Sequence, residues 1–133
     1  MQRSAGVQMT AMTEEQLAPV LRVANTDASI DWYQRLGFAV DYEYSSGPAF
    51  SRTIVVLKRG ELVLMLSNRE EDARPDALVY MRVSDVEAIA DEFDVEVKTS
   101  GIGSFIELRD LDGNRLRIGK LNVRPADLKE SRR

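Results

Sequence analysis

The chain of 133 residues contains no cysteine and no histidine. Without cysteine it cannot form disulfides, use a thiolate nucleophile or build a cysteine-based zinc site. Without histidine it lacks the commonest metal ligand and the commonest general base at neutral pH. No apolar run approaches the roughly 20 residues that span a bilayer, and the first residues lack the apolar block of a secretory signal. The sequence therefore predicts a cytoplasmic protein with no membrane partner.

The composition that remains is sufficient for one compact domain. Apolar residues make up 44% of the chain, and a domain of this length buries roughly two thirds of the surface of its unfolded chain. The net charge of −4 argues against a polyanion-binding surface, so we expect no nucleic-acid partner. We expect a flexible leader over 1–13, a domain over 14–121 and a polar tail over 122–133. Translation could start at Met1, Met9 or Met12.

Two segments, at 22–33 and 82–93, follow the same pattern. In each, an arginine and a valine end a short apolar stretch, and a capped amphipathic segment follows. A recurrence of this kind indicates two copies of one supersecondary unit. We assign the first copy to 17–67 and the second to 78–120. Two such units facing each other would enclose a cleft.

Each copy is expected to run as strand, helix and three strands. In the first copy, Thr26 is the expected N-cap of a helix over 27–36, and Gly37 its stop. In the second, Ser84 and Glu87 have the spacing of a capping box. The expected strands, from periodicity and turn residues, are 17–23, 38–44, 51–58, 61–67, 78–83, 95–98, 104–109 and 114–119. The sequence thus predicts an α+β fold in which two βαβββ repeats form curved mixed sheets around a cleft.

Three segments resemble a known family. They are APVLRV at 18–23, WYQRLGF at 32–38 and LRDLDGN at 108–114. Together with the doubled βαβββ order, they are similar to the glyoxalase/bleomycin-resistance/dioxygenase superfamily, also called the vicinal oxygen chelate proteins. The resemblance covers residues 17–120. The second segment ends a helix and the third turns a hairpin, so both report the fold and neither carries chemistry.

The resemblance also implies four metal-ligand positions, where the enzymes of the superfamily carry His and Glu. They fall at Ala18, at Val63 or Met65, at Leu78 and at Arg117. Three are apolar and the fourth is a cation, whereas a first-row metal site needs about three or four donors. We therefore expect no metal and no cofactor, and we assign no catalytic residue. The chain looks like the metal-free branch, the bleomycin resistance proteins, which bind a drug without changing it.

Strand alternation assigns the residues that would face the cleft. Side chains that alternate with the helix-facing ones, together with two aromatic residues beside the 45–49 loop, form the candidate ligand-binding set. These are Val20, Arg22, Tyr44, Phe50, Glu61, Val63, Met65, Leu78, Tyr80, Arg82, Phe105, Glu107, Arg109 and Arg117. Unpaired buried arginine costs several kcal/mol, so these arginines must pair with Glu61 and Glu107, reach water or meet a ligand anion. Two interpretations stay open, a solvated ion-pair network on an open sheet and a pocket for an aromatic or anionic molecule.

The sequence therefore predicts a metal-free protein that binds a small organic ligand, as in antibiotic or toxin sequestration. Proteins of that branch work as dimers and sometimes exchange the N-terminal strand at a proline, which implies a homodimer here with an exchange near Pro19. Bleomycin is a cation, so the arginines argue against bleomycin itself as the ligand. Three alternatives stay open. They are a glyoxalase-type lyase or dioxygenase with displaced ligands, a degenerate dimerisation module, and a metal-independent enzyme with Glu107 as base or Tyr80 as acid.

Overall fold

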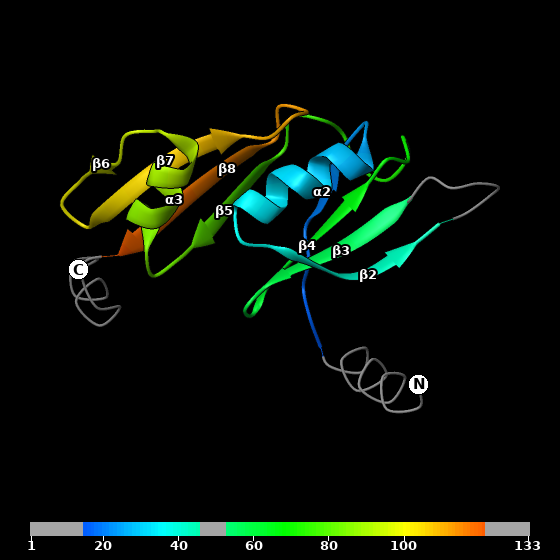
Figure 1. The fold of residues 1–133 in the computed structure, drawn as a ribbon, viewed down its shortest axis with the longest axis horizontal. Coiled ribbons are helices and arrows are strands. Elements are labelled where there is room, and N and C mark those ends of the chain that lie inside the picture. Colours follow the sequence, from blue (N-terminus) through cyan, green and yellow to red (C-terminus); the bar gives the residue numbers. More distant parts are fainter. Residues whose placement is uncertain (1–14, 46–52, 122–133) are drawn as a thin grey trace, which may run out of the picture.

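The computed structural model describes residues 15–45 and 53–121, which form two sheets and two helices (Figure 1). Sheet A contains, in spatial order, β1 (Val20–Arg22), β4 (Leu62–Ser67), β3 (Ile54–Arg59) and β2 (Ala39–Tyr44). Sheet B contains, in the equivalent order, β5 (Leu78–Arg82), β8 (Arg115–Leu121), β7 (Gly103–Arg109) and β6 (Lys98–Thr99). The helices are α2 (Thr26–Arg35) and α3 (Val86–Phe93). The expected leader over 1–13, Phe50 and the expected tail over 122–133 lie outside the described residues.

The two sheets have the same mixed topology. β1 runs parallel to β4 and β5 runs parallel to β8, whereas the other neighbouring strands are antiparallel. In each half of the chain, the last strand returns to lie beside the first. The predicted α+β fold with two mixed sheets is confirmed, and Figure 1 shows the sheets side by side along the long axis. Within the described residues, neither helix is long and apolar enough to cross a membrane.

Both helices begin at a cap one residue away from the one expected. The side chain of Asn25, not Thr26, accepts a hydrogen bond at 3.0 Å from the N–H three residues further on. Asp85, not Ser84, does the same for α3 at 3.1 Å, so the expected capping box is wrong. Asn, Asp, Ser and Thr all make good N-caps, so backbone geometry decides between adjacent candidates. The expected stop of α2 at Gly37 is confirmed, since this glycine has a φ of 95° directly after the C-cap.

The core lies where the helices pack on one face of each sheet. Along the strands, buried side chains alternate with partly or fully exposed ones, as the period of two predicts. The buried helix-facing residues of the strands are Leu21, Val55, Leu57, Leu64, Leu66, Met81, Ile106, Leu108, Leu116 and Ile118. The helices also contact each other, because the ring centroids of Trp32 and Phe93 lie 5.1 Å apart. We call the opposite face of each sheet, turned away from the helices, its outer face.

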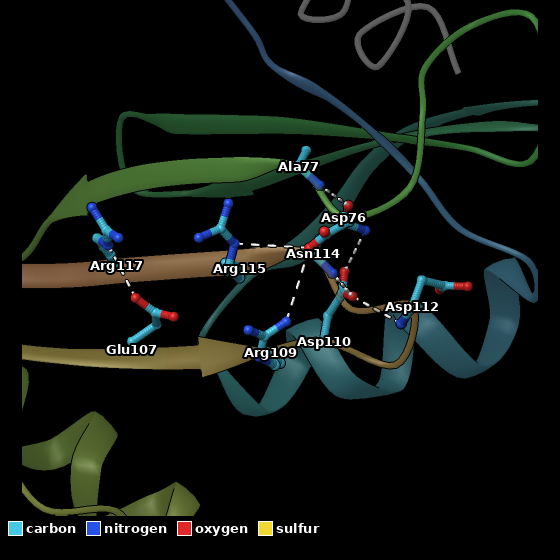
Figure 2. Close-up of polar contacts among 9 residues, drawn as sticks. All are labelled: Asp76, Ala77, Glu107, Arg109, Asp110, Asp112, Asn114, Arg115 and Arg117. Atoms are coloured by element: carbon cyan, nitrogen blue, oxygen red, sulfur yellow. Dashed lines mark hydrogen bonds and ion pairs between the residues drawn. The ribbon is translucent and has the colours of Figure 1, made fainter.

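A buried carboxylate in the turn between β7 and β8 links the two halves of the chain (Figure 2). Asp110 is 6% exposed, and its Oδ1 accepts hydrogen bonds from the backbone N–H groups of Asp112 and Asn114, both at 2.9 Å. Its Oδ2 accepts from the side-chain amide of Asn114 at 3.0 Å and from the hydroxyl of Tyr33, on α2, at 2.7 Å. Burial, and then the charge of Asp110, raise the pKa of Tyr33 far above its usual range. The Tyr33 hydroxyl therefore keeps its proton and donates it to this bond.

Asn114 extends this network to the backbone of both sheets. Its side chain is completely buried, its amide nitrogen donates to the carbonyl of Arg22 at 3.0 Å, and its amide oxygen accepts from the N–H of Ala77 at 3.0 Å. Arg22 ends β1 and Ala77 directly precedes β5, so the turn holds the first strand of each sheet. Through this bond the turn also positions β5, which carries part of the outer face of sheet B (Figure 2).

Candidate functional site

The candidate site lies on the outer face of sheet B. Residues directly opposite each other on neighbouring strands share one face of a sheet, so the strand register places these side chains in three rows. The rows are Leu78, Arg115 and Arg109; Tyr80, Arg117 and Glu107; and Arg82, Gly119, Phe105 and Lys98. Every residue predicted from the strands of the second half therefore shares this one face. Arg115, which strand alternation also places on it, lies there too, and Lys98 is a further cation on the same face.

A cleft of about 650 Å³ opens over this face. Its lining residues are Tyr80, Val95, Glu96, Lys98, Phe105, Ile106, Glu107 and Arg117. Small-molecule sites span roughly 300–1,000 Å³, so the cleft has the size of a ligand site. Half of the lining residues were predicted from strand alternation. Val95, Glu96 and Lys98 lie in the strand expected over 95–98, whose faces were not assigned from the sequence. In the structure only Lys98 of these belongs to a strand, β6. The remaining lining residue, Ile106, is one of the buried helix-facing residues.

Gly119 determines how the aromatic side chains of the cleft lie. A Cβ atom built on Gly119 would stand 2.6 Å from Cδ1 of Phe105 and 3.1 Å from the hydroxyl of Tyr80. The ring of Phe105 therefore occupies the space that any other side chain would fill, and the Tyr80 hydroxyl lies beside it. The result is an aromatic floor against the strand, on which a planar ligand ring can stack. Tyr80, which is 53% exposed, also lines the cleft.

Charged side chains cross the same face in two ion-pair groups (Figure 2). Nε of Arg117 donates to Oε1 of Glu107 at 3.0 Å, with side chains 54% and 40% exposed. Asp76, just before β5, lies 3.9 Å from Nη1 of Arg109 and 3.8 Å from Nε of Arg115. Two guanidinium groups thus share the single carboxylate of Asp76. Guanidinium groups therefore predominate in the two rows that Arg109, Arg115 and Arg117 occupy.

This electrostatic environment bears on the chemistry that Glu107 can perform. The hydrogen bond from Arg117 is the largest cause of the lowered pKa of Glu107. Desolvation opposes it, and the charges of Arg117, Arg115 and Arg109 each add a smaller lowering. A general base works best with a pKa near the operating pH, so a carboxylate with a lowered pKa is a weak base. The geometry therefore disfavours the metal-independent enzyme with Glu107 as base.

The residues predicted on sheet A lie on a separate surface, the outer face of that sheet. The register places Val20, Met65, Val56 and Tyr42 in one row, and Arg22, Ser67, Ile54 and Tyr44 in the next. Val63 lies on the same face, opposite Lys58. None of these side chains lines the 650 Å³ cleft. A smaller pocket of about 230 Å³ does bring Glu61 and Val63 together with Tyr80 of sheet B. The predicted residues of the two sheets therefore meet only at this smaller pocket among those described, and not in the 650 Å³ cleft.

Two predicted residues lie differently from the expectation. Glu61 belongs to the turn between β3 and β4 rather than to a strand, because Gly60, with a φ of 58°, reverses the chain before β4 begins. Arg22 does not pair with Glu61 or Glu107. It instead lines a polar cavity with residues 70–75, and its Nε has no hydrogen-bond partner among the described residues.

The positions that the resemblance assigns to metal ligands do not fit a metal ion. Leu78 presents an exposed apolar side chain, and Arg117 is a cation paired with Glu107. Val63 offers no donor atom and Met65 only a soft thioether. Across residues 15–45 and 53–121, no group of three Asp, Glu, His or Cys side chains is placed to hold an ion. The described residues at these positions therefore do not provide the ligand set that a first-row metal ion needs.

The fold and the cleft over its second sheet define a glyoxalase-type α+β protein. The chain belongs to the glyoxalase superfamily, since a family model described as "Glyoxalase superfamily protein" matches residues 4–119. The resemblance seen in the sequence is thereby confirmed. No curated protein matches the chain in sequence.

Solved structures with the same fold include several antibiotic-binding proteins. A bleomycin-binding protein complexed with bleomycin is 21% identical with a TM-score of 0.59, over 80% of this chain and 98% of that one. A bleomycin resistance determinant encoded on the transposon Tn5 is 19% identical with a TM-score of 0.62, over 83% and 100%. TnmS3, an antibiotic binding protein from Streptomyces sp. CB03234, is 17% identical with a TM-score of 0.64, over 83% and 98%. At these identities the likeness establishes the fold.

Proposed function

We propose that this protein is a metal-free binding protein for a small organic molecule with an aromatic or anionic group, held in the cleft over sheet B. One observation carries the proposal. Arg117, at a position where the resemblance implies a metal ligand, is an ion-paired cation beside the aromatic floor of Phe105 and Tyr80. Such a cleft can hold a ligand by stacking and by charge, and it lacks the donors for metal chemistry.

The structural neighbours support a role in binding a small molecule. The bleomycin-binding protein and TnmS3 both bind antibiotics, and sequestration of an antibiotic or toxin requires only a cleft of suitable shape and charge. The proposed role is therefore sequestration without chemical change. The charge of this cleft differs from what a cationic drug would need, because its two lining carboxylates, Glu96 and Glu107, are matched by two lining cations, Lys98 and Arg117. The charges of Arg109 and Arg115 also act on Glu107.

A thermal unfolding experiment on the full chain tests this function. Naphthoate, an aromatic acid, should raise the unfolding temperature in a concentration-dependent way, because a ligand that binds only the native state stabilises it by mass action. EDTA should leave that shift unchanged, and metal-free bleomycin should produce a smaller shift than naphthoate. If no compound in a panel of aromatic acids, amines and antibiotics raised the unfolding temperature, the result would count against a binding role. A stoichiometric transition metal in elemental analysis would instead favour the lyase or dioxygenase alternative.

The proposal includes a homodimer in which a second copy covers the outer face of sheet A. That face carries apolar side chains that one chain leaves partly exposed, and Tyr42 and Tyr44 are 47% and 48% exposed at its edge. Apolar faces of this kind are typical of subunit contacts. At the N-terminal end, the N–H of Met65 donates to the carbonyl of Pro19 at 2.9 Å, beside the parallel pairing of β1 with β4. If two copies exchanged β1 at Pro19, the bond from Met65 to Pro19 and the pairing of β1 with β4 would form between the copies in the same way.

Sedimentation equilibrium of the full chain should give twice the monomer mass. Tyr42→Asp should shift the equilibrium toward monomer, because it places a charge in the buried contact. Leu111→Asp is the matched control, since Leu111 is 59% exposed in the β7–β8 turn and lies outside sheet A. A wild-type chain that stays monomeric at every concentration, or equal effects of the two substitutions, would contradict the dimer.

A further inference from the structure

We propose that Glu107 and Arg117 form an exchange pair that selects planar aromatic acids. The acidic group of the ligand replaces the carboxylate of Glu107 on the guanidinium of Arg117, while the ligand ring stacks on Phe105. This inference rests on the proposed binding function and names the ligand class and the residues that discriminate it.

The geometry of the exchange pair makes it replaceable. The contact runs from Nε of Arg117 to Oε1 of Glu107, and among the residues drawn in Figure 2 it is the single contact of Arg117. Both side chains are about half exposed, at 54% and 40%. Ion pairs with this exposure contribute little to stability. A ligand carboxylate that binds the guanidinium through two parallel hydrogen bonds makes a stronger contact.

The aromatic floor lies at the right distance from the exchange pair. Arg117 and Gly119 are two residues apart on β8 and face the same side of the sheet. Two residues span about 6.6 Å along a strand, and the ring of Phe105 covers Gly119. A molecule of one or two fused rings with an acidic substituent can therefore stack on Phe105 and reach Arg117 at the same time. Tyr80 lies opposite Arg117 on β5 and lines the same cleft.

The displaced carboxylate of Glu107 finds other cations nearby. Arg109 lies two residues further along β7 on the same face, and Arg115 lies opposite Arg109 on β8. Both share the single carboxylate of Asp76 at 3.9 and 3.8 Å. The charges of both arginines already act on Glu107 and help to lower its pKa. The exchange therefore does not leave Glu107 without a counterion.

The exchange pair gives selectivity because Glu107 competes with the ligand. A neutral aromatic molecule cannot replace a carboxylate on Arg117, so it gains stacking alone. An aromatic cation gains stacking but cannot bind Arg117, and the lining carboxylates that could attract it, Glu96 and Glu107, are balanced by Lys98 and Arg117. An aromatic acid gains both stacking and the guanidinium contact. Specificity of this kind combines one attractive element with a repulsive one.

Calorimetric titration of the full chain with three matched probes tests the inference. The probes are naphthoate, naphthamide and naphthylmethylamine, which share the ring system and differ in charge. The wild-type chain should bind naphthoate about tenfold more tightly than naphthamide, and naphthylmethylamine least. Arg117→Gln should abolish the preference for the acid. Glu107→Gln should strengthen naphthoate binding several-fold, by removing the internal competitor, and leave naphthamide binding unchanged.

Two control variants separate the exchange from long-range charge. Arg69→Gln, in the connector after β4, and Glu87→Gln, on α3, carry the same changes in net charge and do not line the cleft. Both should bind all three probes as the wild type does. Weaker naphthoate binding by Glu107→Gln would overturn the exchange, and a preference for the amine would overturn the ligand class. Neither result contradicts the proposed binding function. That function is contradicted only if no compound of the wider panel raises the unfolding temperature either.

Discussion

Asp110→Ala is expected to lower the free energy of unfolding by about 3 kcal/mol or more. The substitution removes the acceptor of four hydrogen bonds, two from backbone N–H groups of the turn and two from the side chains of Tyr33 and Asn114. Tyr33 and Asn114 are both 0% exposed, so neither can turn to water. Each buried donor left without an acceptor costs roughly 1–3 kcal/mol.

Urea unfolding of matched variants measures this loss. Asp112→Ala is the control, because Asp112 lies in the same turn and accepts one exposed hydrogen bond, from the N–H of Ala24 at 3.0 Å. We expect Asp112→Ala to cost about 1 kcal/mol or less. Asp110→Asn should fall between the two, since an amide oxygen can still accept from the turn backbone. Equal losses for the two alanine variants would show that the buried network does not hold the halves together.

The fold was predictable to the extent that its signals are local. Alternation with a period of two predicted which strand residues, such as Leu64 and Leu66, are buried, because neighbouring side chains of a strand point to opposite faces. The contact between Tyr33 and Asp110 was not predictable in this way. The two residues belong to segments that the sequence presents as separate signatures of a helix end and a hairpin turn. Their hydrogen bond depends on how α2 packs against the turn, which no local pattern contains.

The candidate site shows the same division. Alternation placed Tyr80, Phe105, Glu107 and Arg117 on one face, and the structure brings these residues together in one cleft. Gly119 was missed because a position without a side chain leaves no trace in a pattern of polar and apolar side chains. Its effect appears only when the ring of Phe105 is seen to occupy the vacant space.

Gly119→Val is expected to weaken naphthoate binding at least about tenfold, while the free energy of unfolding changes by about 1 kcal/mol or less. The new Cβ would stand 2.6 Å from Cδ1 of Phe105, so the ring must leave the strand and move into the cleft. Because the obstructing atoms belong to a partly exposed side chain and valine suits a strand, the fold can accept the change. The floor on which a ligand stacks would be lost.

Gly101→Val provides the control for Gly119→Val, because a Cβ atom at Gly101, in the loop before β7, meets nothing within 4 Å. This control should bind naphthoate as the wild type does.

Phe105→Leu should weaken naphthoate binding like Gly119→Val, because it removes the stacking surface and leaves the glycine in place. If Gly119→Val bound naphthoate normally, the ligand would have to lie elsewhere on sheet B. If it failed while Phe105→Leu bound normally, the effect would be steric closure of the cleft and not the loss of stacking. Only parallel loss in both variants identifies the ring of Phe105, laid against a strand that has no side chain at Gly119, as the surface that holds the ligand.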